Sequence, residues 1–170
     1  MKTLRFFDNE YPNNGYNHTR KVVRGILLNE KNEVALVKLY GYDSFGYRSY
    51  YETPGGGKEK YESNIKTLKR ELLEEVGVTI KNIKPIAKVI DFYNLINRRN
   101  INYYYLCRVK TYEEQHLEEY EKELMSGLVW VPLNEVVEVY QDVAVNSISR
   151  LCIQREVTIL EMAVKMLIKD

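Results

Sequence analysis

The stretch Gly56–Val78, GGKEKYESNIKTLKRELLEEVGV, is the most informative part of this chain. It leaves a Pro-Gly-Gly-Gly loop and enters a segment, Ser63–Val76, that has the apolar periodicity of a helix. Gly77 is a natural stop for that helix, because glycine adopts the left-handed conformation of a C-cap at little cost. The apolar side chains that share one stripe are Ile65, Leu68, Leu72 and Val76.

Three glutamates, Glu71, Glu74 and Glu75, crowd the last turns of this predicted helix. We expect them on one face, opposite the apolar stripe, where like charges at these spacings repel by roughly 0.2–0.5 kcal/mol per pair. The negative end of the helix dipole costs each carboxylate about 0.3–1 kcal/mol more. A solvated acidic face, helped by Lys69 and Arg70, is the plain alternative. Two broken local rules in one place favour a functional site.

The glycine loop before the helix favours the functional interpretation further. A glycine backbone can approach a ligand or a metal closely. Carboxylate oxygens and a backbone carbonyl form a hard ligand set that suits Mg²⁺ or Mn²⁺. A divalent cation would turn the repulsion among the three carboxylates into attraction. Magnesium held by carboxylates and open to water recurs in phosphate chemistry.

The segment resembles the signature of the Nudix hydrolase family, of which MutT is a member, at every fixed position. These positions are Gly56, Glu62, Arg70-Glu71-Leu72, Glu74-Glu75 and Gly77-Val78. The resemblance implies a single domain over residues 1–170 with an α/β fold of the α+β type, in which a mixed β-sheet lies between helices in an α/β/α sandwich. The strand order around the box, with a hairpin before it and Trp130 in a strand after it, is similar to that of the family.

The same resemblance implies an activity and a set of roles. Nudix hydrolases use water and a divalent cation to cleave the pyrophosphate bond of a nucleoside diphosphate linked to another group, X. The metal ligands it implies are Glu71, Glu74, Glu75 and the backbone carbonyl of Gly55. Glu71 would activate the attacking water, and Arg70 would pair with Glu62 to hold the Glu71 turn in place. A plain surface salt bridge is the alternative for that pair.

The motif does not identify a further acidic ligand, the phosphate contacts or the substrate. Many family members take one further acid from the loop before the Trp strand, and here Glu121 is the first candidate and Glu123 the second, although a solvated charge run explains that stretch equally well. Arg48 and the pair Arg98-Arg99 could contact phosphates, but a surface position at a hairpin tip is favoured for the pair. ADP-ribose-like compounds and (deoxy)nucleoside triphosphates head the substrate candidates.

Composition limits the partners. Lys and Arg number 25 and Asp and Glu 24, so a net charge of +1 gives no bulk attraction to nucleic acid or to an anionic membrane. Cys107 and Cys152 are expected to be core thiols in a reducing compartment. The start of the chain has no signal-peptide pattern, and no window reaches the roughly 20 apolar residues of a membrane span, which predicts a cytoplasmic protein. The family also makes a homodimer compatible with this sequence.

Two other functions are alternatives to hydrolysis. A Nudix-fold sensor would bind the nucleotide without turnover, but the complete set of acids argues against it. An isomerase of isoprenoid diphosphates would need a catalytic cysteine, and neither Cys107 nor Cys152 has a local context that supports one.

The remaining elements follow from periodicity and turn residues. Strands are predicted at Arg20–Leu28, Glu33–Tyr40, Phe45–Thr53, Ile83–Tyr93, Asn100–Val109 and Leu128–Leu133. The first two should form a hairpin around the polar turn between them. Asn134 is expected to cap a short helix over Glu135–Tyr140, and Asn146–Ile168 should be mostly helical, in one or two pieces.

Overall fold

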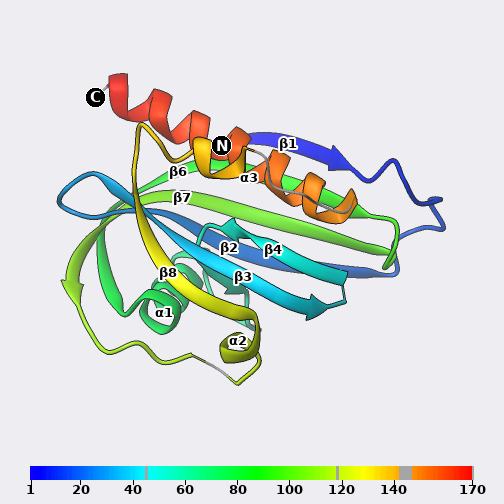
Figure 1. Cartoon of the computed structure of the whole chain (residues 1–170), viewed down its shortest axis with the longest axis horizontal. Helices are drawn as coiled ribbons and strands as arrows, with labels where there is room; N and C mark the ends of the chain where they lie inside the picture. Colours follow the sequence, from blue (N-terminus) through cyan, green and yellow to red (C-terminus); the bar gives the residue numbers. More distant parts are fainter. Residues whose placement is uncertain (45, 118, 142–146, 170) are drawn as a thin grey trace.

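The computed structural model describes residues 1–44, 46–117, 119–141 and 147–169. Within these residues, an eight-stranded sheet lies between helix α3 on one face and helix α1 on the other (Figure 1). The main strand order is β1-β6-β7-β2-β3-β4, with β5 paired to β2 and β8 paired to β3. The elements are β1 (Lys2–Phe7), β2 (His18–Leu28), β3 (Glu33–Asp43), β4 (Gly46–Glu52), β5 (Gly55–Gly57), α1 (Asn64–Val76), β6 (Val78–Tyr93), β7 (Arg98–Tyr112), α2 (Glu119–Leu124), β8 (Met125–Pro132), the 3-10 helix η1 (Glu138–Tyr140) and α3 (Ser147–Lys169).

The sheet is mixed, because β1 runs parallel to β6 and β2 runs parallel to β7, whereas the other pairs are antiparallel. The predicted α/β/α sandwich is therefore confirmed, as is the hairpin of β2 and β3. Three elements, β1, β5 and α2, were not predicted, and the residues of β5 were expected to be part of a loop. The segment Asn146–Ile168 was predicted to be mostly helical, and it corresponds to α3, which is one continuous helix. Asn146 itself lies outside the described residues.

The predicted helix over Glu135–Tyr140 is wrong. The backbone N–H of Glu135 donates to Pro132, and that of Glu138 donates to Glu135, at 2.9 Å each. These are the three-residue steps of tight turns and of a 3-10 helix, which here covers only Glu138–Tyr140. Asn134 therefore does not cap a helix, and η1 begins after Val137 with no side-chain cap.

Helix α1 begins and ends where the sequence predicts. The Ser63 hydroxyl accepts a hydrogen bond from the N–H of Lys66, and Gly77 takes the left-handed C-cap with φ of 68°. A side chain at Gly77 would also collide with the carbonyl of Glu113, at 2.7 Å from the added Cβ. The predicted apolar stripe is wrong for Ile65, which is 37% exposed. The buried apolar residues of α1 are Leu68, Leu72 and Val76.

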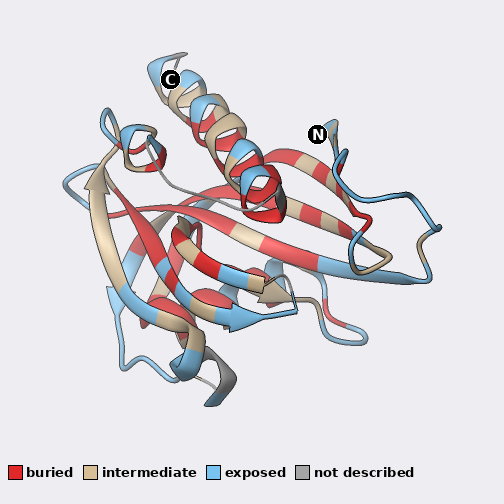
Figure 2. Cartoon of the chain, turned by 45° about the vertical axis from the view of Figure 1, so that its right-hand side comes forward, coloured by how far each residue is buried: buried red, intermediate tan, exposed pale blue. Residues whose placement is uncertain are grey.

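The core lies on both faces of the sheet. Successive tyrosines of β7 alternate between these faces, with Tyr104 packed on the α3 side and Tyr103 and Tyr105 on the α1 side. Figure 2 shows that the buried stripe of α3 faces the sheet, while its outer side is exposed. Cys107 and Cys152 are both buried and free, as expected of core thiols. No described helix is both long enough and apolar enough to cross a bilayer.

Candidate active site

The glycine loop after β4 forms one part of the candidate site. Its residues Gly55–Gly57 make the short strand β5, which pairs antiparallel with Val22–Arg24 of β2. Gly55 has φ of 137°, and an added Cβ there would come within 2.7 Å of the Cα of Arg24. Only glycine combines this backbone conformation with so close an approach to β2. The loop therefore holds its backbone N–H and C=O groups in fixed positions beside α1.

Helix α1 presses two of its carboxylates against this loop. The N–H of Gly55 donates to Glu75 Oε2 at 2.6 Å. A Cβ at Gly56 would lie only 2.7 Å from the carboxyl carbon of Glu71, so the absence of a side chain makes room for that carboxylate. Glu71 and Glu75 are only 4% and 7% exposed. The expectation that these glutamates lie opposite the buried stripe is thus wrong for both, because β5 covers the helix face that bears them.

Arg70 contacts three of the acidic residues of this cluster. Its Nε and Nη2 donate to the two carboxylate oxygens of Glu62 at 3.2 Å, and its Nη1 donates to Glu74 at 2.9 Å. Nη2 also donates to the carbonyl of Gly57 at 3.0 Å and forms an ion pair with Glu71 at 2.8 Å. The hydrogen bonds from Arg70 and from Thr67 outweigh burial and lower the pKa of Glu62 to about 2. Arg70 thus fixes the position of the loop and of three carboxylates together.

The charge balance of this cluster fits a divalent cation. Glu62, Glu71 and Glu74 contact the guanidinium of Arg70, and Lys66 lies 3.9 Å from Glu62. Glu75 accepts the N–H of Gly55 instead. Among these residues four carboxylates face two cations, so negative charge is in excess at the glycine loop. Their oxygens are the hard donors that Mg²⁺ and Mn²⁺ prefer. Across the described part of the chain, no three acidic, His or Cys side chains form a preassembled metal site. Binding would require Glu71 and Glu74 to exchange part of their contact with Arg70 for the cation.

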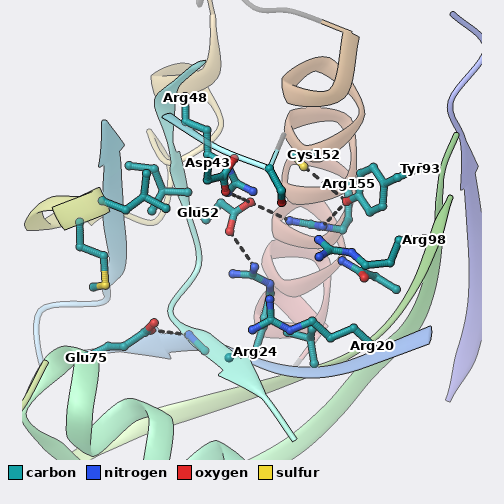
Figure 3. Close-up of a pocket in the computed structure, with 18 of the residues that line it drawn as sticks. Arg20, Arg24, Asp43, Arg48, Glu52, Glu75, Tyr93, Arg98, Cys152 and Arg155 are labelled. Carbon is teal, nitrogen blue, oxygen red and sulfur yellow. Dashed lines mark hydrogen bonds and ion pairs between the residues drawn. The ribbon is translucent and has the colours of Figure 1, made fainter. Parts of the chain in front are cut away.

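A cavity of about 340 Å³ opens next to the cluster (Figure 3). Gly55, Gly56 and Glu75 line one part of it. The remaining lining is rich in arginine, with Arg20 and Arg24 from β2, Arg48 from β4, Arg98 from β7 and Arg155 from α3. A cavity that carries carboxylates beside a glycine loop and guanidinium groups on other walls is suited to a phosphorylated ligand that brings a cation with it.

A buried ion network anchors α3 against this cavity. Arg155, which is 1% exposed, pairs with Asp91 at 2.8 Å and with Glu52 at 3.2 Å. Arg24 donates to Glu52 at 2.6 Å and to the carbonyl of Thr53 at 2.7 Å, at the entrance to the glycine loop. Burial alone would raise the pKa of Glu52, but Arg24, Arg155 and Arg48 outweigh it and lower that pKa to about 2. The network keeps charged groups paired under the site.

Sequence reasoning missed this network and placed one arginine wrongly. Glu52, Asp91 and Arg155 are scattered along the chain, and no local spacing marks them as partners. Arg98 lines the cavity rather than lying at the surface with Arg99, which is exposed. The alternation of side chains along a strand is the signal that would have separated these two neighbours.

The two candidates for an additional acid differ in what the structure describes. Glu123, near the end of α2, lines the cavity. The side chain of Glu121 lies outside the described residues.

Solved structures of other proteins share this fold. The chain is similar to a NUDIX hydrolase from Nitrosomonas europaea, with 17% sequence identity, a TM-score of 0.61 and coverage of 80% of this chain and 86% of that one. It is also similar to a MutT NUDIX hydrolase from Burkholderia pseudomallei, with 15% identity, a TM-score of 0.61 and coverage of 81% and 98%. A mutator MutT protein from Bacillus halodurans aligns at 25% identity, with a TM-score of 0.51 and coverage of 71% and 72%.

No curated protein matches the sequence. The sequence profile of the NUDIX domain matches residues 18–151, which include β2, the glycine loop, α1 and the start of α3. The chain therefore belongs to the NUDIX hydrolases, a family of pyrophosphohydrolases that act on nucleotide substrates and typically use divalent metals.

Proposed function

We propose that this chain hydrolyses the pyrophosphate bond of a nucleoside diphosphate linked to another group, by attack of water at phosphorus in the presence of Mg²⁺ or Mn²⁺. ADP-ribose-like compounds and (deoxy)nucleoside triphosphates are the candidate substrates. The observation that carries the proposal is the carboxylate cluster on α1, which packs against a glycine loop at the edge of an arginine-lined cavity.

The residues proposed to hold the cation are Glu71, Glu74, Glu75 and the backbone carbonyl of Gly55. Glu75 already accepts the N–H of Gly55, so side chain and loop backbone are adjacent. A bound divalent cation supplies charge neutralisation at the diphosphate and lowers the pKa of water. Glu123 is the proposed source of one further oxygen, because it lines the same cavity from α2. Glu121 remains the other candidate.

Glu71 is the proposed general base, because its carboxylate lies at the loop and is almost completely buried. A buried carboxylate that gives up part of its contact with Arg70 can accept a proton from the attacking water. Arg70 and Glu62 are positioning residues in this scheme. The guanidinium spans Glu62, Glu74 and the Gly57 carbonyl, so it fixes the turn of α1 from which Glu71 projects.

The test is a panel of nucleotide compounds incubated with Mg²⁺, with release of nucleoside monophosphate measured for wild type and for Glu71→Gln. We expect hydrolysis by the wild type and loss of it in Glu71→Gln. Glu161→Gln, an exposed change of the same kind on α3, is the matched control and should retain the activity. Tight nucleotide binding without product under either metal would instead identify a sensor on the Nudix fold.

A further inference from the structure

Asn100, in β7, brings a polar group without a protein partner to the cavity. Its side chain lines the cavity, and the residue is only 7% exposed. The carboxamide Oδ1 is buried, and among the described residues it has no hydrogen-bond partner. A buried acceptor that loses water without gaining a partner destabilises the folded protein. Because most buried polar groups are hydrogen-bonded, a ligand that donates to this oxygen would explain its position in the cavity wall.

The register of the sheet places Asn100 near the glycine loop. Asn100 pairs with Arg20 of β2. Val22, two residues further along β2, pairs with Gly57 on its other side. The Cα atoms of Asn100 and Gly57 are therefore two strands across and two residues along from each other, roughly 12 Å at the usual strand spacing and rise. A ligand whose diphosphate lies at the loop would present the group next to the diphosphate near Asn100.

The surroundings of Asn100 favour a group that both donates and accepts hydrogen bonds. Arg20 lies beside Asn100 on the same face of the sheet, lines the cavity too, and offers only donors. Ionised phosphate oxygens only accept, so a phosphate would leave Oδ1 without a donor. A hydroxyl donates one hydrogen bond and accepts others, so a single hydroxyl can contact the amide oxygen and a guanidinium together.

The cavity offers a nucleobase a different wall. Its apolar and aromatic lining consists of Leu39 and Tyr42 from β3, Leu124 from α2 and Met125 from β8. In the sheet order, β3 lies beyond β2 when counted from β7. Bases stack on aromatic rings and pack on aliphatic side chains, so this wall suits the base. The polar wall of β7 is then left for a sugar.

We propose that Asn100 determines substrate specificity by accepting, through Oδ1, a hydrogen bond from a sugar hydroxyl of the substrate. This inference rests on the proposed function. The hydroxyl belongs to the ribose of the nucleoside or to a sugar in group X, because both adjoin the diphosphate. The acceptor destabilises the protein alone and stabilises the complex, in which the hydroxyl becomes its partner.

The experiment measures kcat and KM of the wild type and of Asn100→Leu for ATP, for 2′,3′-dideoxyadenosine triphosphate and for ADP-ribose. Leucine has a similar size but no acceptor. KM should rise about 10-fold for a substrate whose hydroxyl is bound, with little change in kcat, and should stay unchanged for the dideoxy compound. A rise for ATP assigns the hydroxyl to the nucleoside, and a rise for ADP-ribose alone assigns it to group X.

A second readout separates ligand binding from a structural role. Leucine removes an acceptor that has no protein partner, so the urea midpoint of Asn100→Leu without substrate should equal or exceed that of the wild type. Asn102→Leu is the matched control on the same face of β7. Asn102 also has an unpartnered Oδ1, but its Nδ2 donates to Asp91 at 2.8 Å and it is not part of the cavity lining. Its midpoint should fall, and its KM values should not depend on the sugar hydroxyls.

The outcomes distinguish this proposal from the proposed function. The role of Asn100 is overturned, and hydrolysis stands, if Asn100→Leu leaves every KM unchanged, as it would if Oδ1 bound only water. The same conclusion follows if KM rises equally for all three compounds or if the urea midpoint falls below that of the wild type. Asn100→Ala replaces the leucine variant in the kinetic test if that variant does not fold.

If the wild type hydrolyses none of the three compounds, the proposed function falls. Calorimetric titration of the wild type and of Asn100→Leu with ADP-ribose, ATP and the dideoxy compound then decides the role of Asn100. Weaker binding of a hydroxyl-bearing compound alone would support it, and equal binding by the two proteins, or none by the wild type, would overturn it.

Discussion

Gly56→Ala is the single substitution that tests the proposed role of Glu71 most directly. Its added Cβ would lie 2.7 Å from the carboxyl carbon of Glu71, whereas ordinary van der Waals contact begins near 3.4 Å. Oε2 of Glu71 would lie nearer still, so the carboxylate must retreat by at least about 0.7 Å (3.4 minus 2.7). Gly56 does not have a positive φ, so alanine fits the backbone there. The change displaces the proposed general base and leaves the fold otherwise undisturbed.

We expect activity and stability to separate in this variant. A displacement approaching 1 Å in a catalytic group costs up to about 100-fold in rate, so kcat should fall by about 10- to 100-fold. The free energy of unfolding should change by less than about 1 kcal/mol, because a carboxylate can swing aside and alanine restricts the unfolded chain. Steady-state hydrolysis and urea denaturation measure the two quantities.

Gly57→Ala is the matched control for kcat. The three atoms nearest to its Cβ all belong to the flexible side chain of Arg20, at 3.3 Å or more, so kcat should stay near that of the wild type. An unchanged kcat in Gly56→Ala would refute the role of Glu71. A loss of several kcal/mol of stability would show instead that Gly56 is needed for folding.

Two further predictions concern stability. Arg155→Met leaves Asp91 buried without its cation and removes one of the arginines that pair with Glu52, so the free energy of unfolding in urea should fall by about 3–5 kcal/mol. Arg150→Met breaks only an exposed pair and should cost about 1 kcal/mol or less. The pKa of Glu62 is lowered from 4.5 to about 2 in the folded state, so its contribution to stability is present above about pH 4.5 and is lost as the pH falls toward 2. Glu62→Gln should therefore flatten the decline of unfolding free energy across that window, and an unchanged slope would contradict the Arg70–Glu62 contact.

The parts of the fold that depend on local chemistry could be predicted from the sequence. Ser63 and Gly77 mark the ends of α1 because capping needs only neighbouring backbone groups. The strand β1 escaped prediction because Lys2–Phe7 becomes a strand by pairing with Ala87–Phe92, far along the chain. Likewise, the turns after Pro132 override the helical pattern of Glu135–Tyr140 through short-range hydrogen bonds.

The candidate site shows the same division. The motif indicates Glu62, Arg70 and Glu71, and in the structure Arg70 contacts both glutamates. A helical projection treats a glutamate as solvent-facing, so it could not predict that β5 would bury Glu71. The arginines of the cavity come from three strands, β2, β4 and β7, and from helix α3, and tertiary structure sets how these elements meet. Of these arginines, only Arg48 and Arg98 are predicted from the sequence as phosphate contacts.

The central claim is that the carboxylates of α1 hold a divalent cation at the glycine loop. Titration of the protein with Mn²⁺, followed by electron paramagnetic resonance of the free ion, tests it without any substrate. We predict binding to the wild type and to Glu161→Gln, and affinity weakened by about 10-fold or more in Glu74→Gln. Equal Mn²⁺ binding by Glu74→Gln and the wild type, or no binding by either, would contradict it.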